Sequence, residues 1–264
     1  MLNWHVSRVF FDAAGCFLSL SVQEKAMRLS LGDPIVDIVF PGFDLGDFAV
    51  LFGNAAVFMS FVLSVRCLMP TEEGGLNSAV VFADGGNTFD LYLIGEIARS
   101  YGLNPRRVLE KIYVSRAFTA YQFTSLILEK LEIVLRQKRA RLLVVSDVAS
   151  LFLDKDVPKT EAEDLFLKVC VKLSQISANK QAIVAATYLH SQMPMQSLRF
   201  RHYLFGHSNV IAEVKGDENV LSLILEDHQR IKAFSRDFSA EFAPLMAFGR
   251  CNSWGEQFHL IDRL

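Results

Sequence analysis

Residues 79–152 read AVVFADGGNTFDLYLIGEIARSYGLNPRRVLEKIYVSRAFTAYQFTSLILEKLEIVLRQKRARLLVVSDVASLF. Short apolar runs alternate here with longer segments of helical character. The elements are, in order, a strand at Ala79–Ala83, a turn and helix over Asp84–Tyr101, a strand at Ile112–Phe118, a helix over Tyr121–Gln137 and a strand at Arg141–Val145. Apolar runs of this length are typical of strands buried on both faces. Their alternation with helices predicts βαβ units and a parallel sheet.

Two turns in this region are the first candidates for a functional site. In open parallel sheets, ligands bind beyond the carboxyl ends of the strands. Those ends are followed here by Asp84-Gly85-Gly86-Asn87-Thr88 and by Ser146-Asp147. Asn104-Pro105 predicts one further short helix, because Asn caps helices and Pro fits the first helical position.

The rest of the chain extends the same α/β pattern on both sides. We expect a strand at Phe48–Phe52, a turn at Gly53-Asn54 and a buried helix to Leu68, then a helix over Thr160–Ala178, a strand at Gln181–Thr187, an antiparallel hairpin of Asn209–Val214 with Val220–Leu225, and edge strands at Arg230–Ser235 and Phe242–Phe248. We expect connecting strand and turns over Arg28–Leu45, an exposed loop over Thr71–Ser78, a long loop over His190–Gly206 and helical parts within residues 1–27. The sequence thus predicts one α/β domain over residues 28–264, with a mostly parallel sheet flanked by helices and antiparallel strands toward its C-terminal edge. Residues 1–27 form a separate N-terminal segment.

Composition limits the class of protein. The 264 residues are 51% hydrophobic with a net charge of −2, which predicts a large core and no global attraction to nucleic acid. Four dispersed cysteines and six scattered histidines show no metal-binding spacing. No signal-peptide pattern is present, so we expect a reducing, cytoplasmic setting. The apolar segment Phe48–Val65 has the length of a membrane span, but a central turn favours a buried strand and helix, so we expect no membrane contact.

The order of these motifs resembles the core ATPase domain of the RecA/RadA class of recombinases, particularly its archaeal–eukaryotic branch. The resemblance extends from about Arg28 to about Leu225. Its most specific part comprises Asn87-Thr88-Phe89, Tyr101-Gly102-Leu103 and Ile112-Tyr113-Val114-Ser115-Arg116-Ala117. It implies the RecA-like fold and a relationship to DNA recombination and repair.

The resemblance also locates the family's phosphate-binding loop, G-x-x-x-x-G-K-[ST], whose amides and Lys hold phosphate and whose hydroxyl helps to hold magnesium. The matching octet runs from Gly53 to Ser60, and only these two end residues agree with the motif. Phe58 replaces the second Gly, and Met59 replaces the Lys. The resemblance therefore implies a degenerate Walker A motif.

The other catalytic positions are also altered. The family's water-orienting acidic residue falls on Gly86, and its Walker B aspartate falls on Ser146 with Asp147 displaced by one position. The polar sensor after the next strand appears as Thr187-Tyr188-Leu189. Phosphoryl transfer depends on the Lys, on magnesium and on the water-orienting group. We therefore expect an inactive ATPase with no bound ATP or magnesium.

Three alternatives stay open at this stage. A rearranged ATPase site would use Asp84 or Asp147 for the metal. Weak nucleotide binding without hydrolysis is the second. The third is a scaffold of the KaiC type that is unrelated to DNA. The favoured interpretation is a non-catalytic paralogue that serves recombination or repair as an accessory or regulatory factor, through protein contacts and weak single-stranded DNA binding.

Two basic segments are candidates for nucleic-acid binding. Arg199, Arg201 and His202 fall, with aromatic neighbours, in the loop that corresponds to the family's second DNA-facing loop. Arginine with aromatic residues suits single-stranded DNA, and a solvated loop explains the same residues equally well. The run Arg136–Arg141 ends a predicted helix, where the dipole favours cations, so a solvated face is the favoured interpretation there.

The N-terminal segment contains a candidate assembly motif. Phe11-Asp12-Ala13-Ala14 matches the Phe-x-x-Ala pattern by which recombinase protomers plug into their neighbours. The resemblance implies Phe11 and Ala14 as the plug and an active RadA/RecA-type recombinase or another paralogue as the partner. A helix face packed on its own domain is an equally good interpretation.

Overall fold

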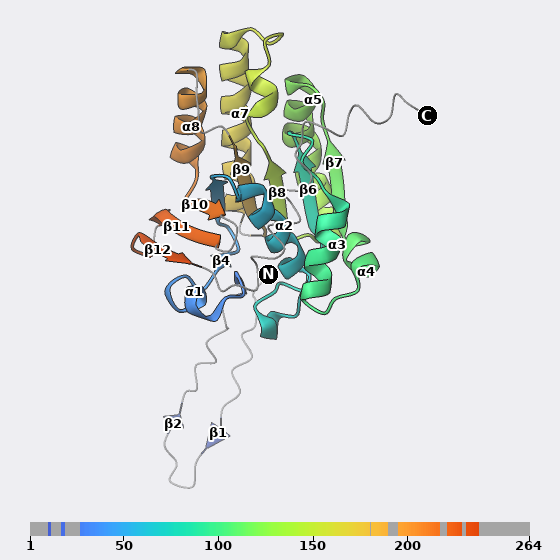
Figure 1. Cartoon of the computed structure of the whole chain (residues 1–264), viewed down its shortest axis with the longest axis vertical. Helices are drawn as coiled ribbons and strands as arrows, with labels where there is room; N and C mark the ends of the chain where they lie inside the picture. The colour runs from blue at the N-terminus through green and yellow to red at the C-terminus, as the bar shows by residue number, and fades with distance from the viewer. Residues whose placement is uncertain are drawn as a thin grey trace.

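The computed structural model describes residues 27–179, 181–189, 195–216, 221–228 and 231–237, together with two short N-terminal strands, β1 (Phe10–Phe11) and β2 (Phe17–Leu18). A central sheet has the strand order β12-β11-β10-β5-β9-β8-β6-β7. Its strands are β5 (Phe48–Phe52), β6 (Val80–Asp84), β7 (Ile112–Arg116), β8 (Leu142–Ser146), β9 (Ile183–Tyr188), β10 (Val210–Gly216), β11 (Leu221–His228) and β12 (Phe234–Asp237). The pairs from β10 to β7 are parallel, and β11 and β12 add antiparallel strands at one edge. The predicted mostly parallel α/β sheet is confirmed (Figure 1).

Helices cover both faces of the sheet. They are α1 (Pro34–Val39), α2 (Ala56–Cys67), α3 (Leu91–Ser100), α4 (Pro105–Leu109), α5 (Ala120–Ser125), α6 (Leu131–Lys138), α7 (Lys159–Ala178) and α8 (Met195–His207). A π-helical turn at Leu126–Lys130 joins α5 to α6, and short strands β3 (Arg28–Leu29) and β4 (Phe43–Asp44) pair beside the sheet. Two cores result because side chains alternate along each strand: Phe82 packs with Phe61 on the α2–α3 face, and Val81 packs with Phe123 and Phe166 on the α5–α7 face. This arrangement positions the carboxyl ends of the parallel strands along one edge (Figure 1).

The predicted start of the short helix at Asn104-Pro105 is confirmed. Asn104 Oδ1 accepts a hydrogen bond from the Arg106 amide at 3.0 Å, and Pro105 occupies the first turn of α4. Asp90 caps α3 in the same way through the Tyr92 amide at 2.8 Å. These local signals fix where each crossover helix begins, and so fix the length of the turns that follow the strands.

The expectation of a long loop over His190–Gly206 is wrong, because Met195–His207 forms α8. Among the α8 side chains that the structure describes, the buried stripe consists of Ser197, Phe200 and Leu204, and large side chains on the other faces hide that period in the sequence. Arg199, Arg201 and His202 therefore lie on a helix.

The Arg28–Leu45 segment also contains a helix that was expected to be turns. Asp33 Oδ1 accepts from the Val36 amide at 3.0 Å, and Pro34 takes the first position of α1. Asp33-Pro34 suits a turn as well as a capped helix start, so the sequence alone does not distinguish the two. The exposed loop over Thr71–Ser78 is confirmed only in part, since Leu76 is buried.

The N-terminal expectation of helix is wrong at the positions that the structure describes. Phe10 pairs with Leu18 and Phe11 with Phe17 in an antiparallel ladder. Ala14 and the expected strand at Phe242–Phe248 lie outside the described residues. The division into residues 1–27 and 28–264 stays a prediction.

Candidate functional site

The turn after β5, which corresponds to the phosphate loop, is joined tightly to β10. The Ala55 amide donates to the Val214 carbonyl oxygen at 3.1 Å. The Asn54 side chain exchanges two hydrogen bonds of 2.8 Å with the backbone of Gly216. Gly53 has φ +99°, and a Cβ on it would lie 2.4 Å from the Val214 oxygen, so only glycine fits this close approach. The turn thus directs backbone and side-chain polar groups toward β10.

The start of α2 places apolar side chains where the family motif has its second Gly and its Lys. Met59 is 1% exposed and Phe58 is 8% exposed, and both belong to the core on the α2–α3 face. The Ser60 hydroxyl is buried and donates to the Val57 carbonyl oxygen at 2.7 Å. The octet therefore presents no cation, and its hydroxyl already has a partner.

Asp84, at the end of β6, is fully buried and heavily hydrogen-bonded. One carboxylate oxygen accepts from the amide and hydroxyl of Thr88, at 2.8 and 3.3 Å. The other accepts from the Phe89 amide at 3.2 Å and from Arg116 Nε at 3.0 Å. The carboxylate thus holds the Asn-Thr-Phe turn and joins β6 to β7, which is a structural use of its lone pairs.

Hydroxyl groups join the carboxyl ends of three neighbouring strands. The Thr88 and Ser146 hydroxyls lie 2.5 Å apart, and the Ser146 and Thr187 hydroxyls lie 3.4 Å apart. The Asp147 amide donates to the Thr187 hydroxyl at 2.8 Å. Ser146, at the Walker B position, therefore belongs to a buried hydroxyl network.

The displaced carboxylate of Asp147 lies beside Gly86. Asp147 follows the end of β8 with φ 47°, so strand alternation no longer decides where its side chain points. A Cβ on Gly86 would lie 2.5 Å from the Cβ of Asp147 and 2.7 Å from one of its carboxylate oxygens. The two altered catalytic positions therefore share one space, which the Asp147 side chain fills.

The candidate DNA-binding arginines are engaged with other groups of the protein. Arg199 forms an ion pair of 2.9 Å with Glu163 on α7. The Arg201 guanidinium lies over the rings of Phe52 and Phe205, with its carbon 5.1 and 4.8 Å from the ring centroids. Arg201 thereby fastens α8 to the end of β5.

The remaining α8 residues divide between surface and core. His202 is exposed and lines a shallow pocket of about 330 Å³ with Leu198, Arg199 and Tyr203. Phe200 is fully buried, so it offers no stacking surface for a base. Only the outer side of α8 could therefore contact a nucleic acid.

Tyr188, at the end of β9, takes the position of the family's polar sensor. Its hydroxyl donates to the Ser197 carbonyl oxygen at 2.8 Å, which joins β9 to α8. Burial raises the pKa of this phenol above its usual value. The side chain is therefore neutral at physiological pH and acts here as a contact between two elements.

Comparison with known proteins assigns the family. A family model described as Rad51 matches residues 23–192, which is more than half of the chain. The chain belongs to the Rad51 family. It is 32% identical over 101 residues to the DNA repair and recombination protein RadA of Aeropyrum pernix. That alignment covers 38% of this chain and 31% of the relative, so the chain spans about a third of the curated relative that it matches.

The family assignment confirms the resemblance drawn from the Asn-Thr-Phe turn and the β7 sequence. The RadA relative that the chain matches is named as a DNA repair and recombination protein. Sequence analysis missed the pairing of Asn54 with Gly216 and the filling of the Gly86 space by Asp147. Both join positions far apart in the chain and leave no local pattern.

Two further features of the Rad51-family chain concern ligands and membranes. In the part of the chain that the structure describes, no three His, Cys, Asp or Glu side chains gather in a group that could hold a metal ion. No described helix combines the length and the apolar character that crossing a bilayer requires.

Proposed function

We propose that this Rad51-family chain is a non-catalytic accessory or regulatory factor in recombination or repair. It acts through contacts with an active recombinase or another paralogue, and through weak contact with single-stranded DNA. The main support for the proposal is the burial of the Met59 side chain in the octet Gly53–Ser60 after β5. A core methionine cannot neutralise phosphate, whereas the family motif uses a Lys at this position.

The surroundings of the octet support the same proposal. Phosphate loops hold anions with unpaired amides at a helix N-terminus. Here the Ala55 amide donates to β10, and Phe58 projects into the core directly after that turn. The Ser60 hydroxyl, which would help to hold magnesium, donates to a backbone oxygen of its own helix.

A rearranged site that uses a nearby carboxylate is a weaker candidate. Asp84 makes four hydrogen bonds within the protein and has no exposed surface. Coordination of a metal would require it to give up the contacts that hold the Thr88 turn. Asp147 is the carboxylate that such a site would need, and its removal is therefore the control for activity assays.

Nucleotide binding tests the proposal in a simple way. A ligand present at a hundred times its dissociation constant stabilises a folded protein by roughly 2.7 kcal/mol. For a domain of this size that is a shift of several degrees, at roughly 2–4 °C per kcal/mol. We expect no shift in melting temperature with ATP and magnesium at low millimolar concentration, and a clear shift would contradict the proposal.

A further inference from the structure

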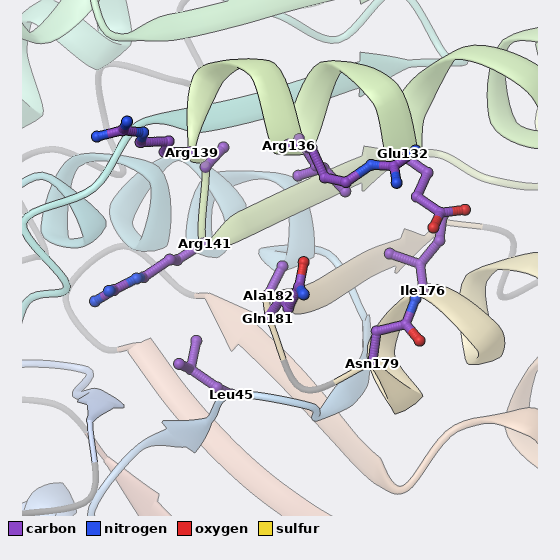
Figure 2. A pocket seen from close by; sticks show the side chains of 11 residues that line it. Leu45, Glu132, Arg136, Arg139, Arg141, Ile176, Asn179, Gln181 and Ala182 are labelled. Carbon is purple, nitrogen blue, oxygen red and sulfur yellow. The ribbon is translucent and has the colours of Figure 1, made fainter. Parts of the chain in front are cut away.

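A pocket of about 480 Å³ lies at the amino ends of β8 and β9, at the opposite edge of the sheet from the candidate site (Figure 2). The last turns of α6 and α7 form its walls through Leu135 and Ile176, and Leu45 closes it from the β4–β5 turn. Asn179 and Gln181 supply amide groups. None of the described residues that line this pocket is aromatic.

Cations surround this pocket and continue along the sheet. We define the basic edge as Lys111, Arg136, Lys138, Arg139 and Arg141. Figure 2 shows the guanidinium groups of Arg139 and Arg141 reaching out on the same side of the pocket. Lys111 and Arg141 immediately precede β7 and β8, the two strands that flank β6 in matched register. Because β6 lies between β7 and β8 and neighbouring strands are about 4.8 Å apart, the charges of the basic edge are spread in a row and not gathered at one point.

Neighbouring groups of the described chain offset these charges only in part, since the Glu132 carboxylate also attracts Arg136. No member of the basic edge forms an ion pair with a carboxylate among the described residues. The carboxylate that lines the pocket, Glu132, is paired with Lys172 at 2.7 Å. The C-terminal ends of α6 and α7 contribute about half a negative charge each, which offsets about one of the five cations. A net positive edge remains on a chain whose overall charge is −2.

Arg139 occupies a backbone position that suits glycine better. It follows α6 in the left-handed conformation, with φ 51° and ψ 37°. The Ala140 amide donates to the Leu135 carbonyl oxygen at 2.9 Å, which completes a helix C-terminal motif whose left-handed residue is usually Gly. Its side chain is exposed and contributes to the pocket rim, so packing does not account for an arginine there.

We propose that the basic edge binds the phosphate backbone of DNA without regard to sequence. A row of five cations suits a polyanion with closely spaced charges, and duplex DNA carries one charge per about 1.7 Å of helix axis. The described pocket lining contains no aromatic residue, and the Tyr113 ring at this edge is covered by Lys138, whose Nζ lies 4.4 Å from the ring centroid. Charge and arginine geometry therefore carry the recognition. The choice of DNA over an acidic protein rests on the proposed role in recombination. The site is separate from α8 and from the octet after β5.

The test uses the full chain and a fluorescein-labelled 30-base-pair duplex of random sequence. The variant Arg136→Gln/Lys138→Gln/Arg139→Gln is compared with Lys155→Gln/Lys159→Gln/Lys168→Gln, which removes the same charge from exposed positions elsewhere. We expect the first variant to lose about tenfold or more in affinity at low salt, and its log–log salt slope to fall by about 2–3. The control variant should retain both values. Equal loss in the two variants, or no loss in either, would overturn the proposal.

Arg139→Gly separates binding from folding. Because Gly adopts the left-handed conformation without strain, this variant should melt at the same or a higher temperature while binding duplex DNA more weakly. Unchanged affinity would remove Arg139 from the site. If polyglutamate displaces the duplex as effectively as unlabelled DNA of equal charge does, the basic edge receives an acidic protein instead. Neither outcome depends on ATP turnover, which tests the proposed function separately.

Discussion

The residues at positions 86 and 147 are linked, because the Asp147 side chain fills the space that a side chain at position 86 would need. A Cβ at position 86 would lie 2.5 Å from the Cβ of Asp147, which is closer than two such carbons can approach. An acidic residue at 86, as the family uses, therefore cannot coexist with the observed Asp147 side chain. In the register that the resemblance implies, the lack of an acidic residue at position 86 and the carboxylate at 147 instead of 146 are therefore one structural change.

This pairing predicts strong coupling between the two positions. Gly86→Ala alone should destabilise the fold by about 1–3 kcal/mol, because it crowds a closely packed space. Asp147→Gly removes the obstructing side chain and suits the left-handed backbone at φ 47°, so the double variant should recover most of that loss. Urea unfolding of both single variants and the double variant measures the coupling. Additive effects would mean that the two side-chain spaces are independent.

At the residue scale, the resemblance indicates which residues stand at the motif positions, but the sequence could not predict what those residues contact. The resemblance located Phe58, Met59 and Gly86 by register alone. The contacts of Asp84 with Thr88 and Arg116 could not be predicted, because they depend on how two parallel strands align. The direction of the Asp147 side chain could not be predicted from strand periodicity either, since the strand ends at Ser146.

At the scale of elements, regular strands and amphipathic helices were predictable, and α8 was not. The apolar runs that became β5, β6, β8 and β9 are buried along their length except at the half-buried Phe52, as runs in parallel sheets are. By contrast, α8 is held by particular contacts, namely Arg201 between two phenylalanine rings and Tyr188 with Ser197. Phe52 is far from Arg201 in the chain, while Phe205 and Ser197 belong to α8 itself, and none of these contacts produces a periodic apolar pattern.

The helical setting of the arginines sharpens the prediction on single-stranded DNA. If Arg199 contacts phosphate, it must leave Glu163, with which it forms a 2.9 Å ion pair. Glu163→Gln should therefore raise the affinity for single-stranded DNA, while Arg199→Ala with Arg201→Ala should lower both affinity and salt slope. Fluorescence anisotropy at several salt concentrations measures these values. Affinity that does not respond to any of the three substitutions would exclude α8 as a DNA contact.

At the scale of the whole molecule, the N-terminal segment is the candidate contact with a partner. The structure describes the backbone of Phe11 in β1, paired with Phe17. An apolar anchor at an interface commonly contributes about 2 kcal/mol or more. We expect Phe11→Ala to abolish capture of an active recombinase from the native host and to leave the melting temperature nearly unchanged. Phe10→Ala is the matched control.

The opposite pattern would show that Phe11 is a core residue. In that case the Phe11→Ala variant loses several degrees of thermal stability, while partner binding per folded molecule persists. Because the proposed absence of bound nucleotide would weaken contacts that ATP bridges between protomers in filament-forming relatives, we expect a small oligomer or a mixed complex. Light scattering of the isolated chain distinguishes this from a long filament.

Steady-state ATP hydrolysis, measured with and without single-stranded DNA, tests the central claim most directly. We propose that a buried Met59, an engaged Ser60 hydroxyl and a Gly86 space filled by Asp147 leave the chain without the groups that stabilise phosphoryl transfer. The account predicts phosphate release at the rate of the protein-free background in both conditions, for the chain and for Asp147→Ala alike. Turnover above background that disappears in Asp147→Ala would contradict it, and would show a catalytic site rebuilt around the displaced carboxylate.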